Sequence, residues 1–196
     1  WGGLAEVALA RADIVYHGIS LSPEQIRFAK ERLADKRYWE ISLTDYRDMG
    51  DQYDAIASVE MVEAVGQEYW PAYLDCIARC LKPGGRAALQ YIRIEDDIFD
   101  QYASGQDFIQ RYIFPGGMLL SESRFRALAE ARGLAWHNQV DYGLHYAETL
   151  KQWRIRFDAA AAQRQLPAGF DANFVALWQF YLMYCEGGFR GGGINV

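Results

Sequence analysis

The stretch Ser58-Val-Glu-Met-Val-Glu-Ala-Val-Gly66 overlaps the end of a short apolar run, Asp54-Ala-Ile-Ala-Ser-Val59, which has the character of a β-strand. Two carboxylates, Glu60 and Glu63, therefore follow this strand at its carboxyl end. In open α/β sheets, ligands bind in the crevice outside the carboxyl ends of the parallel strands. A purely structural alternative is that Glu63 only begins a helix, where an acidic side chain interacts favourably with the helix dipole.

Strands and helices alternate on both sides of this stretch. The pattern predicts, in order, helix 4–12, strand 13–19, a helix from Pro23, strand 38–43, strand 54–59, helix 69–81 and strand 86–94. Ser22 supplies an N-cap before Pro23, and Pro83-Gly84-Gly85 is expected to end the helix 69–81. Such alternation predicts a mostly parallel sheet flanked by helices on both faces.

The second half of the chain has a different pattern. Residues 96–117 are aromatic and polar by turns, which predicts a helical insertion that ends in the turn Phe114-Pro-Gly-Gly117. The remaining predicted segments are a helix over 121–132 closed by Gly133, a strand over 134–140, helices over 147–163 and 171–184, a loop over 187–193 and an interrupted strand over 194–196.

Composition limits the class of protein. The chain has 196 residues, of which 51% are hydrophobic, enough for one core and one domain over residues 1–196. A formal net charge of −6 argues against a nucleic-acid partner, which a basic face would mark. No apolar run approaches the roughly 20 residues that cross a bilayer, and no signal-peptide pattern is present. These features predict a soluble intracellular protein whose membrane contact would be peripheral.

Three cysteines, Cys76, Cys80 and Cys185, do not form a disulfide pattern. Cys76 and Cys80 lie four residues apart in a predicted helix with no second ligand pair, so we expect core positions and no metal. The opening, Trp1-Gly2-Gly3, looks like the second half of a strand-to-helix loop. Glycines there would let the backbone approach a nucleotide-like cofactor at a helix N-terminus. We therefore expect a fragment of a longer chain.

Several further segments contain residues suited to a binding site. They are Gly18-Ile-Ser-Leu-Ser-Pro-Glu-Gln25, Asp45-Tyr-Arg-Asp48, Leu89-Gln-Tyr-Ile92, Tyr142-Gly-Leu-His-Tyr146 and Tyr181-Leu-Met-Tyr-Cys-Glu-Gly-Gly-Phe-Arg190. Structural alternatives exist for each. Ser22 would cap a helix in any case, Tyr46 could belong to the core or the surface, and Gln90 could be an amide bonded at a strand end.

Taken together, these segments resemble the cyclopropane-fatty-acyl-phospholipid synthase family, which includes the mycolic acid cyclopropane synthases. The resemblance runs from Trp1 to about Val196, with the segments in the family's order and spacing. It implies a Rossmann-like class I methyltransferase fold dependent on S-adenosylmethionine (SAM), with its first strand missing from this chain. Residues 102–117 resemble the family's helical insertion, which the resemblance implies to bind the acyl chain.

The resemblance also implies roles for individual residues. Trp1 and Gly2 match the end of the family's glycine-rich loop, residues 20–25 line the SAM ribose and adenosine pocket, and Tyr46 and Arg47 border adenine opposite Val59. The implied cofactor-binding set is Trp1, Gly2, Ser20, Leu21, Ser22, Pro23, Glu24, Gln25, Tyr46, Arg47 and Val59. The implied set around the reaction centre is Glu63, Gln90, Ile92, Tyr146 and Cys185.

In that second set, Glu63, Gln90, the Ile92 backbone and Tyr146 are expected to hold bicarbonate, which would act as the base. Gln90 stands where many members have a histidine. Its amide can both donate to and accept from an anion. Cys185 is expected to line the site and not to act as a nucleophile.

The implied reaction is transfer of a methylene from SAM to the cis double bond of an unsaturated phospholipid acyl chain. The expected location is cytoplasmic, peripheral to the inner face of the membrane, and a homodimer is left open. One alternative is a related SAM-dependent C-methyltransferase that gives a methyl- or methylene-branched product. Another is a non-catalytic lipid-binding module. A small-molecule acceptor would not explain the aromatic insertion.

Overall fold

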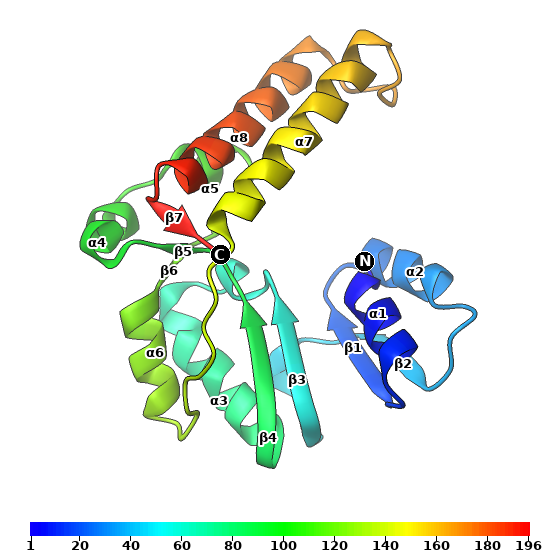
Figure 1. Cartoon of the computed structure of the whole chain (residues 1–196), viewed down its shortest axis with the longest axis vertical. Helices are drawn as coiled ribbons and strands as arrows, with labels where there is room; N and C mark the ends of the chain where they lie inside the picture. Colours follow the sequence, from blue (N-terminus) through cyan, green and yellow to red (C-terminus); the bar gives the residue numbers. More distant parts are fainter. The chain divides into compact units, whose positions relative to one another are not determined.

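Two units form the computed structural model, which describes residues 1–196: Trp1–Tyr53 and Asp54–Val196. The expectation of a single domain over residues 1–196 stays a prediction. The elements of the first unit are α1 (Gly3–Arg11), β1 (Tyr16–Ser20), α2 (Pro23–Arg32), β2 (Trp39–Leu43) and the short 3-10 helix η1 (Tyr46–Asp48). β1 and β2 are parallel, as the alternation predicts (Figure 1).

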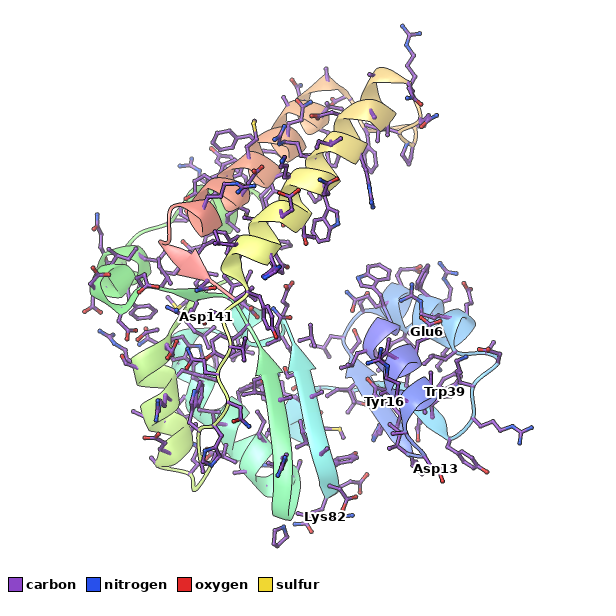
Figure 2. All side chains as sticks on the ribbon, in the orientation of Figure 1. Glu6, Asp13, Tyr16, Trp39, Lys82 and Asp141 are labelled. Atoms are coloured by element: carbon purple, nitrogen blue, oxygen red, sulfur yellow. The ribbon has the colours of Figure 1, made fainter.

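The first unit has its own apolar core. Its buried members are Ala5, Ile26, Ala29, Leu33 and Ile41, which come from α1, α2, the end of α2 and β2. Tyr16 and Trp39 lie opposite one another in the strand register and both pack against this core (Figure 2). Ser22 caps α2 by accepting a hydrogen bond from the Gln25 N–H, and Pro23 occupies the first turn. The predicted cap is therefore confirmed.

The second unit begins with two strands, and the first of them leads into residues 60–66, the acidic loop, which carries Glu60 and Glu63. β3 (Tyr53–Val59) is hydrogen-bonded to β4 (Leu81–Gln90), and both run in the same direction (Figure 1). Between them lie the 3-10 helices η2 (Val62–Ala64) and η3 (Gln67–Tyr69) and the helix α3 (Trp70–Cys80). β4 begins at Leu81, five residues before the predicted start at Arg86. Gly85 permits this, because a Cβ there would lie 3.1 Å from the Asp54 carbonyl oxygen.

Two short helices form the predicted insertion, α4 (Asp96–Ser104) and α5 (Phe108–Tyr112). They are followed by α6 (Glu122–Glu130), which Ser121 caps. A small sheet joins distant parts of the unit. β5 (Arg93–Ile94) pairs in parallel with β6 (Leu120–Ser121) and antiparallel with β7 (Ile194–Asn195). The short strand expected at the end of the chain is thus confirmed.

The predicted strand over residues 134–140 is wrong. Asn138 has a left-handed backbone with φ of 55°, which interrupts an extended run, and the indole N–H of Trp136 donates to Gln139. Local hydrogen bonding replaces a ladder there. The two closing helices are confirmed as α7 (Gly143–Ala162) and α8 (Ala172–Arg190), which form a long hairpin (Figure 1).

The predicted loop over residues 187–193 is wrong in its first half, since α8 continues to Arg190. Phe189 is buried, with an exposed fraction of 3%, and anchors this last turn. Gly188 lets Ile194 of β7 approach the helix, because a Cβ there would meet the Ile194 Cδ1 at 3.0 Å. Packing against the end of the chain therefore outweighs the weak helix propensity of the two glycines. None of the helices is both long enough and apolar enough to cross a membrane.

Candidate functional site

The acidic loop lies where β3 and β4 end. Val59 is the last residue of β3, and Glu60 follows it with φ of 48°, a left-handed conformation that few non-glycine residues adopt. The Glu60 N–H donates to the Gln90 carbonyl oxygen at 2.9 Å. Just after the insertion, the Met118 N–H donates to the Glu63 carbonyl oxygen at 2.7 Å. The loop backbone is therefore fixed by the end of β4 and by the chain that follows α5.

Glu63 lies on η2 with its carboxyl group largely buried. Its Oε1 accepts a hydrogen bond of 2.6 Å from the Ile92 N–H, whereas its Oε2 is buried without a partner. Burial raises the pKa of Glu63 to about 7, and the charge of Glu60 acts in the same direction. At neutral pH this group therefore exchanges readily between carboxylic acid and carboxylate, which suits a site that handles positive charge or protons.

Glu60 joins two residues that are distant in sequence. Its Oε1 accepts hydrogen bonds from the Gln90 side-chain amide, at 3.2 Å, and from the Tyr146 hydroxyl. Tyr146 is on the first turn of α7, and its ring packs 4.9 Å from that of Phe189. Burial raises the pKa of Tyr146, with the hydrogen bond to Glu60 adding to the effect, so the phenol stays protonated as a donor.

The structure thus brings together four of the five residues expected at the reaction centre, and Cys185 lies in the adjoining apolar cluster. That cluster, around Leu150 and Leu182, also includes Ile92 and Tyr146. Burial raises the pKa of the Cys185 thiol to about 12. Because the thiolate is the nucleophilic form, Cys185 is suited to line the site and not to attack a substrate.

The sequence did not indicate that Glu60 binds Gln90 and Tyr146. Its position after the strand marked it as an acidic residue of interest, but its hydrogen bond to Tyr146 spans 86 positions. No local spacing indicates such a contact. Cys76 and Cys80 are both buried on α3, as expected of core residues.

The residues expected to bind the SAM ribose lie in the first unit. Ser20 ends β1, and the Thr44 N–H that follows β2 donates to the Ser20 carbonyl oxygen at 3.3 Å, so the carboxyl ends of the two strands meet. The Ser20 hydroxyl donates to Gln25 Oε1 at 2.9 Å and accepts from the Ser22 N–H at 3.1 Å. These bonds give the wall of residues 20–25 one defined shape.

Tyr46 and Arg47 lie on η1, just beyond the end of β2. Asp45 caps this turn and binds the Arg47 guanidinium through two hydrogen bonds, of 3.0 and 2.6 Å. The hydrogen bond from Arg47 lowers the pKa of Asp45. Tyr46 is half-buried, and a tyrosine ring at this position is of the type that stacks on a planar group.

Trp1 and Gly2 pack on α2. The Trp1 ring lies edge-on to Phe28 at 5.6 Å, and Arg32 donates to the Trp1 carbonyl oxygen at 3.2 Å. Gly2 caps α1 with φ of 81°, and a Cβ there would lie 3.1 Å from the Ala29 Cβ. A glycine is therefore needed at this position for packing as well as for any close approach of a cofactor. Val59 belongs to the second unit, beside the acidic loop.

The resemblance implies that SAM and bicarbonate bind here, and the chemistry of these residues can be compared with each. The donors and acceptors of Ser20 and Gln25, with the flat ring of Tyr46 beyond the neighbouring strand, fit a ribose and an adenine. Bicarbonate fits poorly. The three donors expected to bind it, from Gln90, Ile92 and Tyr146, all donate to carboxylates of the chain. A bound anion would also lie beside the Glu60 carboxylate, where like charges repel.

The raised pKa of Glu63 predicts a pH-dependent stability. Between its ordinary value of 4.5 and about 7, the folded protein keeps a proton that the unfolded chain has released. The free energy of unfolding should therefore fall as pH rises through this range. Glu63→Gln should remove the dependence and raise the free energy of unfolding at pH 8 by on the order of 1–3 kcal/mol. Urea unfolding at pH 4 and pH 8 measures it, with the exposed Glu68→Gln as control.

Comparison with known proteins agrees with this fold. The cyclopropane synthase MmaA2 of Mycobacterium tuberculosis superposes with a TM-score of 0.88 at 20% identity, covering 100% of this chain and 72% of that one. The mycolic acid cyclopropane synthase CmaA1, complexed with SAH and CTAB, superposes with a TM-score of 0.89 at 25% identity and the same coverage. The fold is that of the class I SAM-dependent methyltransferases.

More particularly, the chain belongs to the mycolic acid cyclopropane synthetase family, whose sequence model matches residues 1–196. The tuberculostearic acid methyltransferase UfaA1 of Mycobacterium tuberculosis is 39% identical over 203 residues, covering 100% of this chain and 46% of that protein. The cyclopropane-fatty-acyl-phospholipid synthase of Escherichia coli is 33% identical over 198 residues, covering 100% and 49%. The chain spans about half the length of these curated relatives.

Proposed function

We propose that the protein transfers a methylene from SAM to the cis double bond of an unsaturated fatty acyl chain, carried by a phospholipid. The observation that supports this most strongly is the cluster of Glu60, Glu63, Gln90 and Tyr146 at the ends of β3 and β4, in a chain of this family. An alkene is a weak nucleophile, so it must be aligned with the methyl donor in a site that excludes water.

The cofactor supplies an electrophilic methyl group. In this proposal residues 20–25 line its ribose and adenosine, Tyr46 and Arg47 border its adenine, and Trp1, Gly2 and Val59 are further cofactor-binding residues. Methylation leaves positive charge on the acyl chain. The carboxylates of Glu60 and Glu63 would stabilise that charge, and Cys185 would form part of the apolar wall.

The acyl chain is proposed to run beside α8. Phe108 of α5 contacts Phe180 and Tyr184 with ring centroids 4.6 and 5.6 Å apart, so the insertion packs on this helix. Between α7 and α8 lies an open groove of about 300 Å3. It is lined by Trp153, Arg156, Phe157, Trp178, Tyr181 and Leu182. Tyr181 lines this groove and also packs in the apolar cluster around Leu150 and Leu182 that includes Tyr146 and Cys185. Burial raises its pKa to about 12.

A second candidate is SAM-dependent C-methylation of the same acyl chain to a methyl- or methylene-branched product. The identity of 39% to a protein named tuberculostearic acid methyltransferase favours it. A probable fatty acid methyltransferase of Pseudomonas putida is 29% identical. The mass of the lipid product separates the candidates in part, because a gain of about 14 fits a ring or a methylene branch and a gain of about 16 a saturated branch. NMR of the ring protons then distinguishes the first two.

The proposal places the protein in the cytoplasm, in peripheral contact with the inner face of the membrane that holds its substrate. Flotation of the full chain with phospholipid vesicles tests this contact. Recovery of the protein only in the vesicle-free fraction would contradict it. A non-catalytic lipid-binding module would bind vesicles and SAM without changing the lipid.

Tyr46→Ala is expected to raise the dissociation constant of SAM about tenfold, because one aromatic stacking contact of about 1.5 kcal/mol is lost. Titration calorimetry of the full chain measures it. Tyr38→Ala, which removes an exposed tyrosine of the same unit, serves as the matched control. Equal SAM affinity in the two folded variants would show that Tyr46 does not flank adenine.

A further inference from the structure

The side-chain donors at the end of β4 are already bound to a carboxylate of the chain. The Gln90 amide and the Tyr146 hydroxyl both donate to Glu60 Oε1, and the Ile92 N–H donates to Glu63 Oε1. These are the donors that a small anion would need at this place. The Tyr146 hydroxyl and the Ile92 N–H have one proton each, already bonded to Glu60 and Glu63, so bicarbonate could take these two donors only by displacing a carboxylate that is covalently part of the loop.

The backbone of Glu60 supports a specific placement of this side chain. Its φ of 48° lies in the left-handed region, where residues other than glycine are uncommon. Such outliers persist where the surroundings hold them in place, and they concentrate at functional sites. Here the Glu60 N–H is bound to the Gln90 carbonyl oxygen at 2.9 Å, so backbone and side chain of Glu60 are both tied to the end of β4.

The two carboxylates of the loop differ in what surrounds them. Glu63 is the more buried, and its Oε2 faces no hydrogen-bond partner. Glu60 is more exposed and receives both side-chain donors on Oε1 alone. Its Oε2 therefore keeps its lone pairs for a proton, while Gln90 and Tyr146 hold the group in position.

We propose that the Glu60 carboxylate is the proton acceptor of the reaction, in place of a bound bicarbonate ion. This inference rests on the proposed function. The alkene π pair forms the new carbon–carbon bond while the sulfonium–methyl bond breaks and leaves its electron pair on sulfur. The neighbouring acyl carbon becomes a carbocation. Glu60 Oε2 then takes a proton from the new methyl group, the freed C–H pair closes the ring, and the proton passes to water.

Two substitutions of Glu60 distinguish the loss of its basic carboxylate from the loss of its side-chain volume. Glu60→Gly removes the carboxylate and frees the Gln90 and Tyr146 donors, and glycine accommodates a φ of 48° without strain, so this variant should fold. Glu60→Gln keeps the size and hydrogen-bonding capacity of the side chain but loses the base. Both should lower turnover on unsaturated phospholipid vesicles by roughly 10²-fold or more, the usual effect of losing a general base.

Added bicarbonate tests whether Glu60 or a bound bicarbonate ion is the base. Turnover of the unaltered full chain should be the same in decarbonated buffer and in buffer with added bicarbonate. Glu60→Gly should regain several-fold activity when bicarbonate is added, because the ion can now occupy the freed donors, whereas Glu60→Gln should not. Line broadening of 13C-bicarbonate in NMR gives a readout without turnover, and it should appear with Glu60→Gly only. Glu130→Gln, an exposed substitution on α6, should behave as the unaltered chain does.

Loss of activity of the unaltered chain in decarbonated buffer, with recovery on adding bicarbonate, would overturn the inference and leave the proposed function standing. Undiminished turnover of Glu60→Gln would overturn it in the same way. Absence of any lipid product from the unaltered chain in either buffer would instead show that the proposed function itself is wrong, and the inference would fall with it.

Discussion

Glu63→Gln is expected to lower turnover by roughly 10²–10³, the usual effect of removing one preorganised electrostatic contact, while leaving SAM affinity nearly unchanged. Glutamine has the size of glutamate, and its side-chain oxygen can still accept the 2.6 Å hydrogen bond from the Ile92 N–H. The loop should therefore keep its shape. What disappears is the negative charge that, in the proposed function, stabilises the developing positive charge of the acyl chain.

Single-turnover kinetics with saturating SAM measure the effect, and calorimetry measures SAM affinity separately. Turnover of the unaltered chain should rise with pH through about 7, where burial places the pKa of Glu63, and the variant should lose that rise. Glu68→Gln is the control from the same loop. Full turnover in Glu63→Gln would remove Glu63 from the reaction centre.

Trp70→Ala is expected to lower the free energy of unfolding by about 3–5 kcal/mol. Trp70 begins α3, is only 1% exposed, and packs its ring 5.9 Å from Phe99 and 5.8 Å from Phe125. It therefore joins α3 to α4 and α6, and alanine would leave a cavity among three helices. Urea unfolding followed by circular dichroism measures the loss.

Trp70→Phe provides the matched comparison, because it keeps an aromatic ring in the same place. The buried Trp70 Nε1 has no hydrogen-bond partner, so losing this group removes an unsatisfied donor and offsets part of the lost packing. The phenylalanine variant should therefore lose much less stability than the alanine variant. Equal losses in the two would contradict the role assigned to ring packing.

The elements of the first unit follow closely from the sequence, because local signals specify them. The cap formed by Ser22 and Pro23 begins α2, and short β-branched or aromatic runs form β1 and β2. The predictions were wrong where contacts between distant residues or an unusual backbone conformation determine the secondary structure. Glycines 187 and 188 lie within α8 because Phe189 is buried and Ile194 returns to the helix. The strand expected over 134–140 is absent because of the backbone conformation of Asn138, which its flanking pattern does not indicate.

In the candidate site, too, the sequence indicated individual residues but not the contacts between distant ones. Resemblance pointed to Glu63, Gln90, Ile92 and Tyr146, and the structure gathers all four around the acidic loop. The partnership of Glu60 with Tyr146 depends on α7 folding back to the end of β4, which no sequence spacing encodes. Because of this contact, the Tyr146 hydroxyl is bound to a carboxylate of the chain itself.

The central claim is that the protein transfers a methylene from SAM to an unsaturated lipid, and mass spectrometry of the lipid tests it most directly. The full chain would be incubated with SAM and vesicles of a phospholipid with cis-unsaturated acyl chains, beside vesicles of its saturated counterpart. The account predicts a mass gain of about 14 per modified chain, in the unsaturated lipid only. Binding of SAM with no change in the mass of either lipid would contradict it and identify a non-catalytic lipid-binding module.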